Sequence, residues 1–314
     1  MLKPVYTSPA PIVKIKKQTN RWDKIVPLLF IAPWVIGFLA FTLGPLLYSL
    51  FISFFDWPIV GEHKFIGLDN YKTMFTDDPL FWESLWVTVK FAGLFVPLNL
   101  ITALFLAILL NQKIKGHSIF RTLFYLPSVI SGVALAMIWA WVYNGEYGIL
   151  NYFLSLVGVN GPDWLNNPHS ALIAMVIASL WGQGTMMLIF LAGLKAIPND
   201  LYEAASIDGA NKIQQFFKIT IPMLTPTILF NLITTIISAF QQLTLALILT
   251  GGGPLRSTYF YAMYVYENAF KYFKMGYSSA NAWFMFVIVL ILTLLVFKSS
   301  SAWVYYEGEV KNKS

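Results

Sequence analysis

Charged side chains are nearly absent from the long apolar stretches of this sequence, and that absence limits the chemistry available there. Only Lys90 lies away from the ends of such a stretch, about two helical turns from its start. Carriers driven by protons or ions need Asp, Glu or His inside the membrane, although each buried charge costs roughly 2.5–3.5 kcal/mol. The sequence therefore disfavours an ion-coupled carrier.

The other reactive residue types offer no metal or nucleotide site. The chain has no cysteine, so neither disulfides nor thiol chemistry carry function. His63, His117 and His169 are scattered without the spacing of metal ligands. The run Gly-Gly-Gly-Pro at 251–254 superficially resembles a phosphate-binding loop, but it lacks the Gly-Lys-Ser/Thr ending. Any ATP that drives this protein must therefore be bound by a partner chain.

Uncharged polar residues are ordered within the fifth apolar stretch. Four of them recur at spacings of four, three and four, which places them on one face of a helix. They are Asn231, Thr235, Ser238 and Gln242. Hydrogen bonding between helices explains such a stripe. The wall of a pathway for a neutral polar solute explains it equally well, because amides and hydroxyls both donate and accept. A second polar patch, which includes an aromatic ring, is Trp181, Gly182, Gln183 and Thr185.

The composition indicates the elements that must position these residues. Of 314 residues, 57% are hydrophobic and 11% are charged, whereas soluble chains average about 25% charged residues. A helix needs roughly 20 residues to cross a bilayer. Six apolar stretches are long enough: 25–55, 84–110, 119–143, 171–194, 225–249 and 280–297. We therefore predict an all-α integral membrane protein with six spans. Proline at 27, 33 and 45 predicts that the first span is kinked or split.

The distribution of Lys and Arg predicts the orientation. Fifteen of them fall in the two tails and the second and fourth loops, and five fall in the other loops. Positive charge marks the cytoplasmic side, so both tails, 1–24 and 301–314, are predicted to be cytoplasmic, flanking a permease domain at 25–300. The net charge of +6 then reflects topology, and a nucleic-acid partner is not needed. The first span is too long for the apolar core of a signal peptide, so we expect it to stay in the mature protein.

The loops on the opposite side carry two further patterns. Apolar residues at helical spacing predict a short surface helix at 148–159. The loop 251–279 is rich in aromatic residues, among them Tyr259, Tyr261, Tyr264, Phe270, Tyr272 and Phe273. An aromatic belt at the membrane interface is the favoured interpretation. A docking surface for an external protein is the alternative.

The segment 203–222 differs from an ordinary loop between membrane helices. Glu203, Ala204 and Ala205 favour a helix, and Gly209 permits a sharp turn. Phe216, Phe217 and Ile219 offer an apolar face before Pro222 restarts the next helix. A helix–turn–helix with an exposed acid is suited to insert into a groove of another protein. An amphipathic loop resting on the membrane is the alternative.

This segment resembles the EAA loop of ABC importer permeases. That pattern is Glu-Ala-Ala, three residues, Gly, nine residues, Ile, one residue and Leu-Pro. The matching residues are Glu203, Ala204, Ala205, Gly209, Ile219 and Pro222, with Ile221 in place of Leu. The flanking motifs at 197–210, 249–254 and 275–280 are closer to the carbohydrate-uptake branch, that of the maltose transporter permeases.

The resemblance implies a type I permease of six helices, itself without catalytic activity, in a bacterial plasma membrane. Its partners would be a second and different permease, two ATPases that bind ATP and Mg, and an extracytoplasmic solute-binding protein. The loop 196–222 would couple to the ATPase. The coupling residues would be Glu203, Ala204, Ala205, Asp208, Gly209, Ile219 and Pro222.

The resemblance also implies where the solute passes. In the larger maltose permease the sugar contacts come from the helices that flank the EAA loop. The aligned positions are Trp181, Gly182, Thr185, Thr235, Ser238 and Gln242, with Gln183 beside them. We therefore expect an importer of a sugar or oligosaccharide. A polyol or glycerol-phosphate-like solute, an ion-coupled sugar carrier and a non-transporting scaffold are the alternatives.

Overall fold

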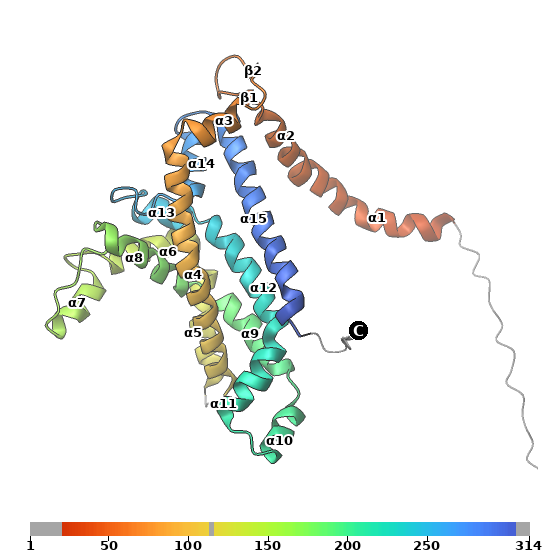
Figure 1. Cartoon of the computed structure of the whole chain (residues 1–314), viewed down its shortest axis with the longest axis vertical. Coiled ribbons are helices and arrows are strands. Elements are labelled where there is room, and N and C mark those ends of the chain that lie inside the picture. Colours follow the sequence, from red (N-terminus) through yellow and green to blue (C-terminus); the bar gives the residue numbers. More distant parts are fainter. Residues whose placement is uncertain (1–20, 113–115, 306–314) are drawn as a thin grey trace, which may run out of the picture. The chain divides into compact units, whose positions relative to one another are not determined.

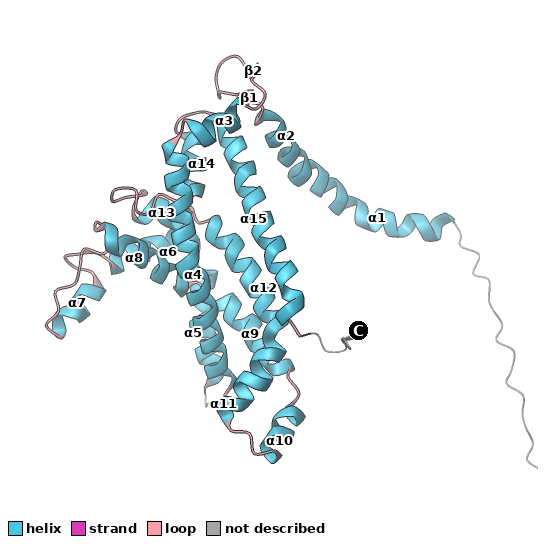
Figure 2. Ribbon diagram, in the orientation of Figure 1, coloured by secondary structure: helices cyan, strands magenta, loops and turns pink. Residues whose placement is uncertain are grey.

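The computed structural model describes residues 21–112 and 116–305. Most of the two predicted tails, 1–24 and 301–314, lies outside these residues. The chain divides into two compact units, Met1–Phe51 and Ile52–Ser314. Helices make up nearly all of the regular structure in the described residues (Figure 2).

The first unit contains a single continuous helix with an irregular middle. It consists of α1 (Arg21–Phe38), a π-helical turn η1 (Leu39–Leu43) and the start of α2 (Gly44–Ile52). The Gly44 N–H donates to the Leu39 carbonyl, five residues back. Pro45 lacks an N–H and cannot donate to the carbonyl four residues back, and this favours the wider turn. The predicted irregularity is therefore a π turn, and the helix is not split.

The second unit begins with a small hairpin and continues as a helical bundle (Figure 1). Strands β1 (Phe55–Asp56) and β2 (Lys64–Phe65) pair antiparallel, with Phe55 opposite Phe65. The helices that follow are α3 (Asp69–Thr76), α4 (Pro79–Asn111), α5 (His117–Val129), α6 (Gly132–Val142), α7 (Ile149–Leu156), α8 (Pro168–Trp181), α9 (Gly184–Ala196), α10 (Asn199–Ile207), α11 (Lys212–Gln215), the π turn η2 (Phe216–Thr220), α12 (Ile221–Phe240), α13 (Thr244–Leu249), α14 (Tyr261–Phe270) and α15 (Met275–Trp303). Helix α7 confirms the short helix predicted at 148–159.

Four helices of the described residues are long and apolar enough to cross a membrane, and six spans result if two bent pairs each count as one. The long helices are Leu29–Ile52, Pro79–Asn111, Lys212–Phe240 and Met275–Trp303. The bent pairs are α5 with α6, at 103°, and α8 with α9, at 53°. The predicted spans 119–143 and 171–194 are therefore broken helices.

Each break has a local cause. After α5, Ile130 adopts an extended backbone, and the Ser131 hydroxyl then caps α6 by accepting from the Ala134 N–H at 3.3 Å. At the start of α9, a Cβ on Gly184 would lie 2.7 Å from the Phe124 carbonyl oxygen. Glycine at this position lets the backbones of α5 and α9 approach closely.

The fifth span differs from its predicted range of 225–249. The helix starts earlier, at Lys212, and ends at Phe240. The chain turns at Gln241–Leu243 before α13 begins, and α13 packs against α6. Gln241 and Gln242 interrupt the apolar sequence here, and the chain turns at these residues before the apolar α13 begins. Gln242, the last residue of the predicted polar stripe, lies beyond the helix end.

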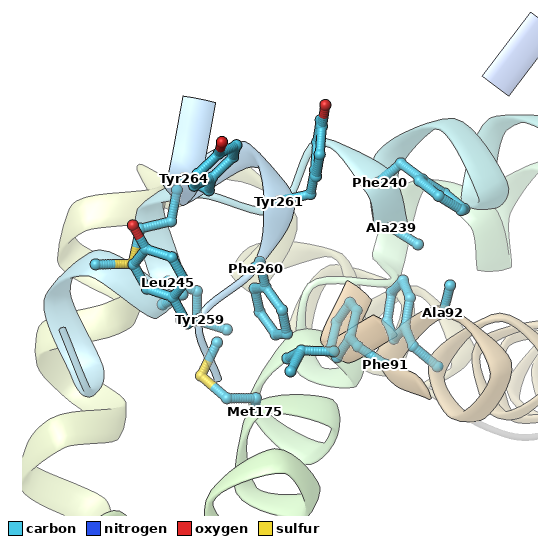
Figure 3. Close-up of a cluster of buried hydrophobic side chains, with 14 of the residues drawn as sticks. Phe91, Ala92, Met175, Ala239, Phe240, Leu245, Tyr259, Phe260, Tyr261 and Tyr264 are labelled. Atoms are coloured by element: carbon cyan, nitrogen blue, oxygen red, sulfur yellow. The ribbon is translucent and has the colours of Figure 1, made fainter. Parts of the chain in front are cut away.

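A core of buried side chains joins α3, α4, α6, α8, α12, α13, α14 and α15 in the second unit. Figure 3 shows Phe91 and Ala92 of α4 close to Phe260, with Met175 of α8 and Leu245 of α13 nearby. The Phe91 ring lies 4.8 Å from that of Phe260. Tyr259, Tyr261 and Tyr264 belong to this core, because at most 8% of each is exposed. These three tyrosines therefore form neither an interfacial belt nor a docking surface. Phe270, Tyr272 and Phe273 of the same loop are more than half exposed, so for them both interpretations stay predictions.

A second core lies between α4, α9 and α12. Ala103 and Ala107 are fully buried and four residues apart on α4, and they pack with Met187 and Phe190 of α9. Lipid tails are as apolar as these side chains, so close van der Waals packing of small residues, and not hydrophobic burial, favours such contacts in a membrane. This core fixes the helices that flank the cavity described below.

A hydrogen-bonded network ties α3, α4, α14 and α15 together at one end of the second unit; it is called the α3 cluster here. One Asp78 oxygen accepts from the hydroxyls of Tyr264 at 2.7 Å and Tyr277 at 3.0 Å. Its other oxygen accepts from the Leu80 N–H and so caps α4. The Tyr261 hydroxyl donates to Asn281 at 3.0 Å.

Candidate functional site

A helical hairpin, residues 196–222, lies at the end of the second unit opposite the α3 cluster (Figure 1). Helix α10 ends where Gly209 adopts a left-handed backbone, with φ of +78°. The Ala210 N–H donates to the Ala205 carbonyl at 2.8 Å and closes the last turn. Asn211 and Gln214 then form a reciprocal cap at the start of α11. Gly209 thus forms the bend that the sequence predicted.

Two side-chain contacts hold the arms of the hairpin together. The buried amide of Gln215 donates to the Ser206 hydroxyl at 2.8 Å and to the Ala210 carbonyl at 3.3 Å. The hydroxyls of Tyr202 and Thr220 are 2.9 Å apart and share a hydrogen bond. Sequence reasoning missed Gln215, because a polar residue in a polar segment shows no sign that a turn will bury it.

The opposite side of the hairpin is exposed and partly apolar. Glu203, Ala204 and Asp208 are exposed, while Ala205, Ile219 and Pro222 are half-buried. Ile207 is 87% exposed, Ile213 is 69% and Phe217 is 64%. Exposed apolar side chains gathered around acids are typical of a surface that another protein covers. Sequence reasoning singled out Phe217 but not Ile207 or Ile213.

A cavity of about 370 Å³ lies between α4, α8, α9 and α12. Its lining residues are Phe95, Asn99, Ser179, Gly182, Gln183, Thr185, Met186, Ile189, Phe230, Asn231, Thr234, Thr235 and Ser238. An adjoining cavity of about 300 Å³ shares three of these residues and adds Gln242. The structure therefore brings six of the seven predicted pathway residues to these two cavities.

Several polar atoms of the two cavities are bonded to one another. Gln183 accepts from the Thr102 hydroxyl at 2.7 Å. The Gln242 amide donates to the Ser179 hydroxyl at 3.2 Å. The Thr235 hydroxyl donates to the Asn231 carbonyl of the preceding turn at 2.6 Å. Of these three bonds, only that of Gln242 joins a residue of the polar stripe to another helix, whereas the Thr235 bond stays within α12. Hydrogen bonding between helices therefore accounts for only part of the stripe.

Two buried amides in the larger cavity remain incompletely bonded. Asn231 is 1% exposed, and neither its side-chain oxygen nor its side-chain nitrogen has a partner among the described residues. Asn99 is 6% exposed, and its side-chain oxygen is likewise unpaired there. An unsatisfied buried polar group costs roughly 1–3 kcal/mol. A polar solute in the cavity would offer the missing partners.

Among the residues that the structure describes, no Asp, Glu, Lys, Arg or His lines either cavity. Lys90 lies elsewhere on α4, with its ammonium group 5.5 Å from the centre of the Trp86 ring. The two cavities are thus chemically suited to an uncharged solute that carries many hydrogen-bonding groups.

Trp181 is the predicted pathway residue that lines neither cavity. It is 38% exposed and meets the Trp139 ring edge to face at 5.9 Å. Phe95 and Asn99 of α4 and Ser179 of α8 do line the larger cavity, although sequence reasoning missed them. Asn99 carried a usable signal, since an amide is rare in the middle of an otherwise apolar span.

Comparison with known proteins identifies the family. A family model described as "Binding-protein-dependent transport system inner membrane component" matches residues 99–306. The chain is 50% identical to the probable ABC transporter permease protein YesP of Bacillus subtilis (strain 168) over 298 residues, which cover 94% of this chain and 96% of the relative. It is 37% identical to the trehalose/maltose transport system permease protein MalF of Thermococcus litoralis (strain ATCC 51850 / DSM 5473 / JCM 8560 / NS-C) over 275 residues, or 86% and 92% of the two chains.

The fold is similar to that of a chain in the crystal structure of a bacterial alginate ABC transporter in complex with an alginate pentasaccharide-bound periplasmic protein. The TM-score is 0.79 at 22% identity, over 90% of this chain and 97% of that chain. Fold and site together define a membrane permease subunit of the type I ABC importer fold, without catalytic activity of its own. The chain belongs to the family of inner membrane components of binding-protein-dependent transport systems. The predicted fold class and the resemblance to maltose-type permeases are confirmed.

Proposed function

We propose that this chain forms one half of the pathway of an ATP-driven importer for neutral sugars or oligosaccharides. The observation that carries the proposal is the pair of adjoining cavities, whose lining among the described residues contains amides, hydroxyls and the rings of Phe95 and Phe230 but no charge. Sugars need many donors and acceptors and no counter-charge. The relative named as a trehalose/maltose permease supports the same substrate class.

The hairpin 196–222 is proposed to couple this pathway to ATP hydrolysis. Glu203, with Ala204 and Asp208, lies on the exposed face, where Ile207 and Phe217 supply apolar contact area. Ala205, Ile219 and Pro222 support that face from behind, and Gly209 sets the bend. An ATPase that closes on nucleotide would move the hairpin and, through the continuous helix from Lys212 to Phe240, the wall of the cavity.

This arrangement requires partner subunits. One hairpin serves one ATPase, so a complex with two ATPases needs a second permease, which we propose to be a different chain. An extracytoplasmic binding protein would deliver the solute. Both termini and the hairpin would face the cytoplasm of a bacterial cell, as the distribution of Lys and Arg predicts.

A glycerol-phosphate-like solute is the second candidate for the transported molecule. A phosphate group calls for Lys, Arg or a metal ion as its partner. The lining of the two cavities supplies none from this chain. The neutral sugar is therefore the better match.

Uptake into proteoliposomes tests the proposal. The chain is reconstituted with its ATPase, second permease and binding protein, and labelled neutral disaccharides and glycerol 3-phosphate are supplied outside with ATP inside. We expect uptake of a neutral sugar that needs ATP and survives an ionophore. Gln242→Leu should lower that uptake at least tenfold, while Gln241→Leu, at a neighbouring residue that lines neither cavity, should leave it within twofold. Uptake that stops with the ionophore, or that ignores Gln242→Leu, would contradict the proposal.

A further inference from the structure

A third cavity, of about 680 Å³, lies between the hairpin and the ends of α4 and α9. It is larger than either cavity of the proposed pathway, and it shares no lining residue with them. Asn111 and Gln112 contribute from the end of α4, Lys195 from α9, and Lys212 and Gln215 from α11. Cavities of this size hold small molecules or lipid headgroups.

The charged residues of this cavity are all of one sign. Lys195 and Lys212 line it, and within 21–112 and 116–305 no Asp or Glu does. Neither lysine forms an ion pair with any carboxylate in the described residues, where the two ion pairs found are Arg256 with Glu83 and Lys271 with Glu267. Two uncompensated ammonium groups at one cavity favour an anion.

The uncharged groups of the cavity add donors around these lysines. The Lys212 ammonium group donates to the Gln215 side-chain oxygen at 3.3 Å, and this bond orients Lys212 while leaving two of its three N–H groups free. The amides of Asn111, Gln112 and Asn199 also line the cavity. A ligand with several oxygens, such as a phosphoryl group, could accept from lysine and amide donors together.

The cavity and the exposed surface of the hairpin lie on different faces. Lys212, Gln215, Phe216 and Thr220 line the cavity, and their spacings of three, one and four place them on one side of the helix. Ile213 and Phe217 do not line it and are strongly exposed. A ligand in this cavity and an ATPase on the exposed surface could therefore be bound at the same time.

We propose that this cavity binds a phosphoryl group, carried either by a soluble sugar phosphate or by an anionic lipid headgroup. Lys195 and Lys212 supply the charge, and the amides at the end of α4 bind the remaining oxygens. Such a ligand bridges α9 to the hairpin, so its binding stabilises one position of the hairpin relative to the bundle. The site is distinct from the neutral cavities, so sugar uptake and phosphate binding can fail independently.

Lysine footprinting on the full-length wild-type chain tests the proposal without any substitution. The chain is placed in phosphatidylcholine nanodiscs and acetylated, and the labelled lysines are identified by mass spectrometry. Two probes are added in turn: glucose 6-phosphate in solution, and phosphatidylglycerol in the disc. We expect at least a threefold slower acetylation of Lys195 and Lys212, with Lys218 as the internal reference because it is exposed but does not line the cavity.

The two probes distinguish the two sources of phosphate. Protection by glucose 6-phosphate alone identifies a soluble ligand, and protection by phosphatidylglycerol alone identifies a lipid. The double variant Lys195→Gln/Lys212→Gln should bind the protecting probe at least tenfold more weakly, while Lys218→Gln binds within twofold of the wild type. Absence of protection by both probes, or equal weakening in Lys218→Gln, would overturn the proposal.

Discussion

The two ends of the second unit are built in opposite ways. In the α3 cluster, Asp78 accepts three hydrogen bonds, from the Leu80 N–H of α4 and the hydroxyls of Tyr264 in α14 and Tyr277 in α15, and both tyrosines are buried. In the hairpin, Gln215 and the Tyr202–Thr220 pair make the contacts between the arms, and apolar side chains face outward. The contacts of the first end are made within this chain, and the exposed apolar side chains of the second support the proposal that a partner covers it.

Reversing the charge of the hairpin should have the largest effect. Glu203→Lys places a cation on the exposed face without touching the contacts that hold the arms, so the chain should fold normally. We expect the ATPase to be lost during co-purification, with affinity at least tenfold lower. Glu62→Lys, an exposed acid of the β1–β2 loop, is the matched control and should retain the ATPase. If the ATPase still co-purified normally with Glu203→Lys, the proposed role of the hairpin in binding it would be contradicted.

Replacing the unpaired amide of the cavity should separate stability from transport. Asn231→Leu removes two buried polar atoms without partners, so the free energy of unfolding should stay the same or rise by up to about 1–3 kcal/mol. Sugar uptake should fall at least tenfold. Leu232→Met, one residue along α12 and outside the cavity lining, controls for repacking of the helix. A variant that is both less stable and fully active would show that Asn231 has a purely structural role.

Weakening the α3 cluster should lower the stability of the fold and leave ATPase binding unchanged. Tyr264→Phe removes a hydrogen bond to the Asp78 carboxylate, which is worth roughly 1.5–3 kcal/mol. Thermal unfolding in detergent would report the loss, and the ATPase should still co-purify. A fall in ATPase binding with unchanged stability would mean that this end also takes part in coupling.

The same cluster predicts how stability depends on pH. Burial raises the pKa of Tyr264, and the hydrogen bond to Asp78 raises it further. A raised pKa means that the contribution of this hydroxyl is fully present below the ordinary tyrosine pKa of about 10 and is lost only as the pH rises above it. Between pH 7 and 9, ionisation of Tyr264 should therefore not lower the unfolding temperature of the wild type. A difference between wild type and Tyr264→Phe that disappears within that interval would contradict this.

Substituting Gly209, at the bend of the hairpin, should have the smallest effect. Gly209→Ala forces a side chain into the left-handed region at a cost of roughly 1–2 kcal/mol, although a Cβ there would meet no other atom. Gly209→Asn should be milder, because asparagine tolerates this conformation. Protease accessibility of the hairpin measures the change. Equal accessibility in wild type and both variants would show that the turn does not depend on glycine.

The sequence predicted the elements better than their breaks and contacts. Hydrophobic periodicity was enough for α7, and residue spacing was enough for the bend at Gly209. The end of the fifth span at Phe240 was missed, because the apolar residues that resume after Gln241 and Gln242 were assigned to the same helix, whereas they form α13, which packs on α6. The aromatic residues at 259–264 were misjudged because composition alone cannot show which side of a loop is buried.

The candidate site shows the same limit. Spacing along one helix grouped Asn231, Thr235 and Ser238, since a helix brings residues four apart to one face. It could not reveal Asn99 or Ser179, because these reach the cavity through the packing of α4 and α8 against α12. A single sequence does not show which residues of different helices come together in the folded bundle.

Cross-linking from the hairpin tests the central claim most directly. The chain has no cysteine, so Ala204→Cys in the exposed face of α10 gives a unique site for a benzophenone maleimide. Photolysis of the assembled importer should join this site to the ATPase, more strongly with ATP bound than without, while Glu62→Cys gives no such product. Adducts with lipid alone, in a transporter that still imports its solute, would contradict the account.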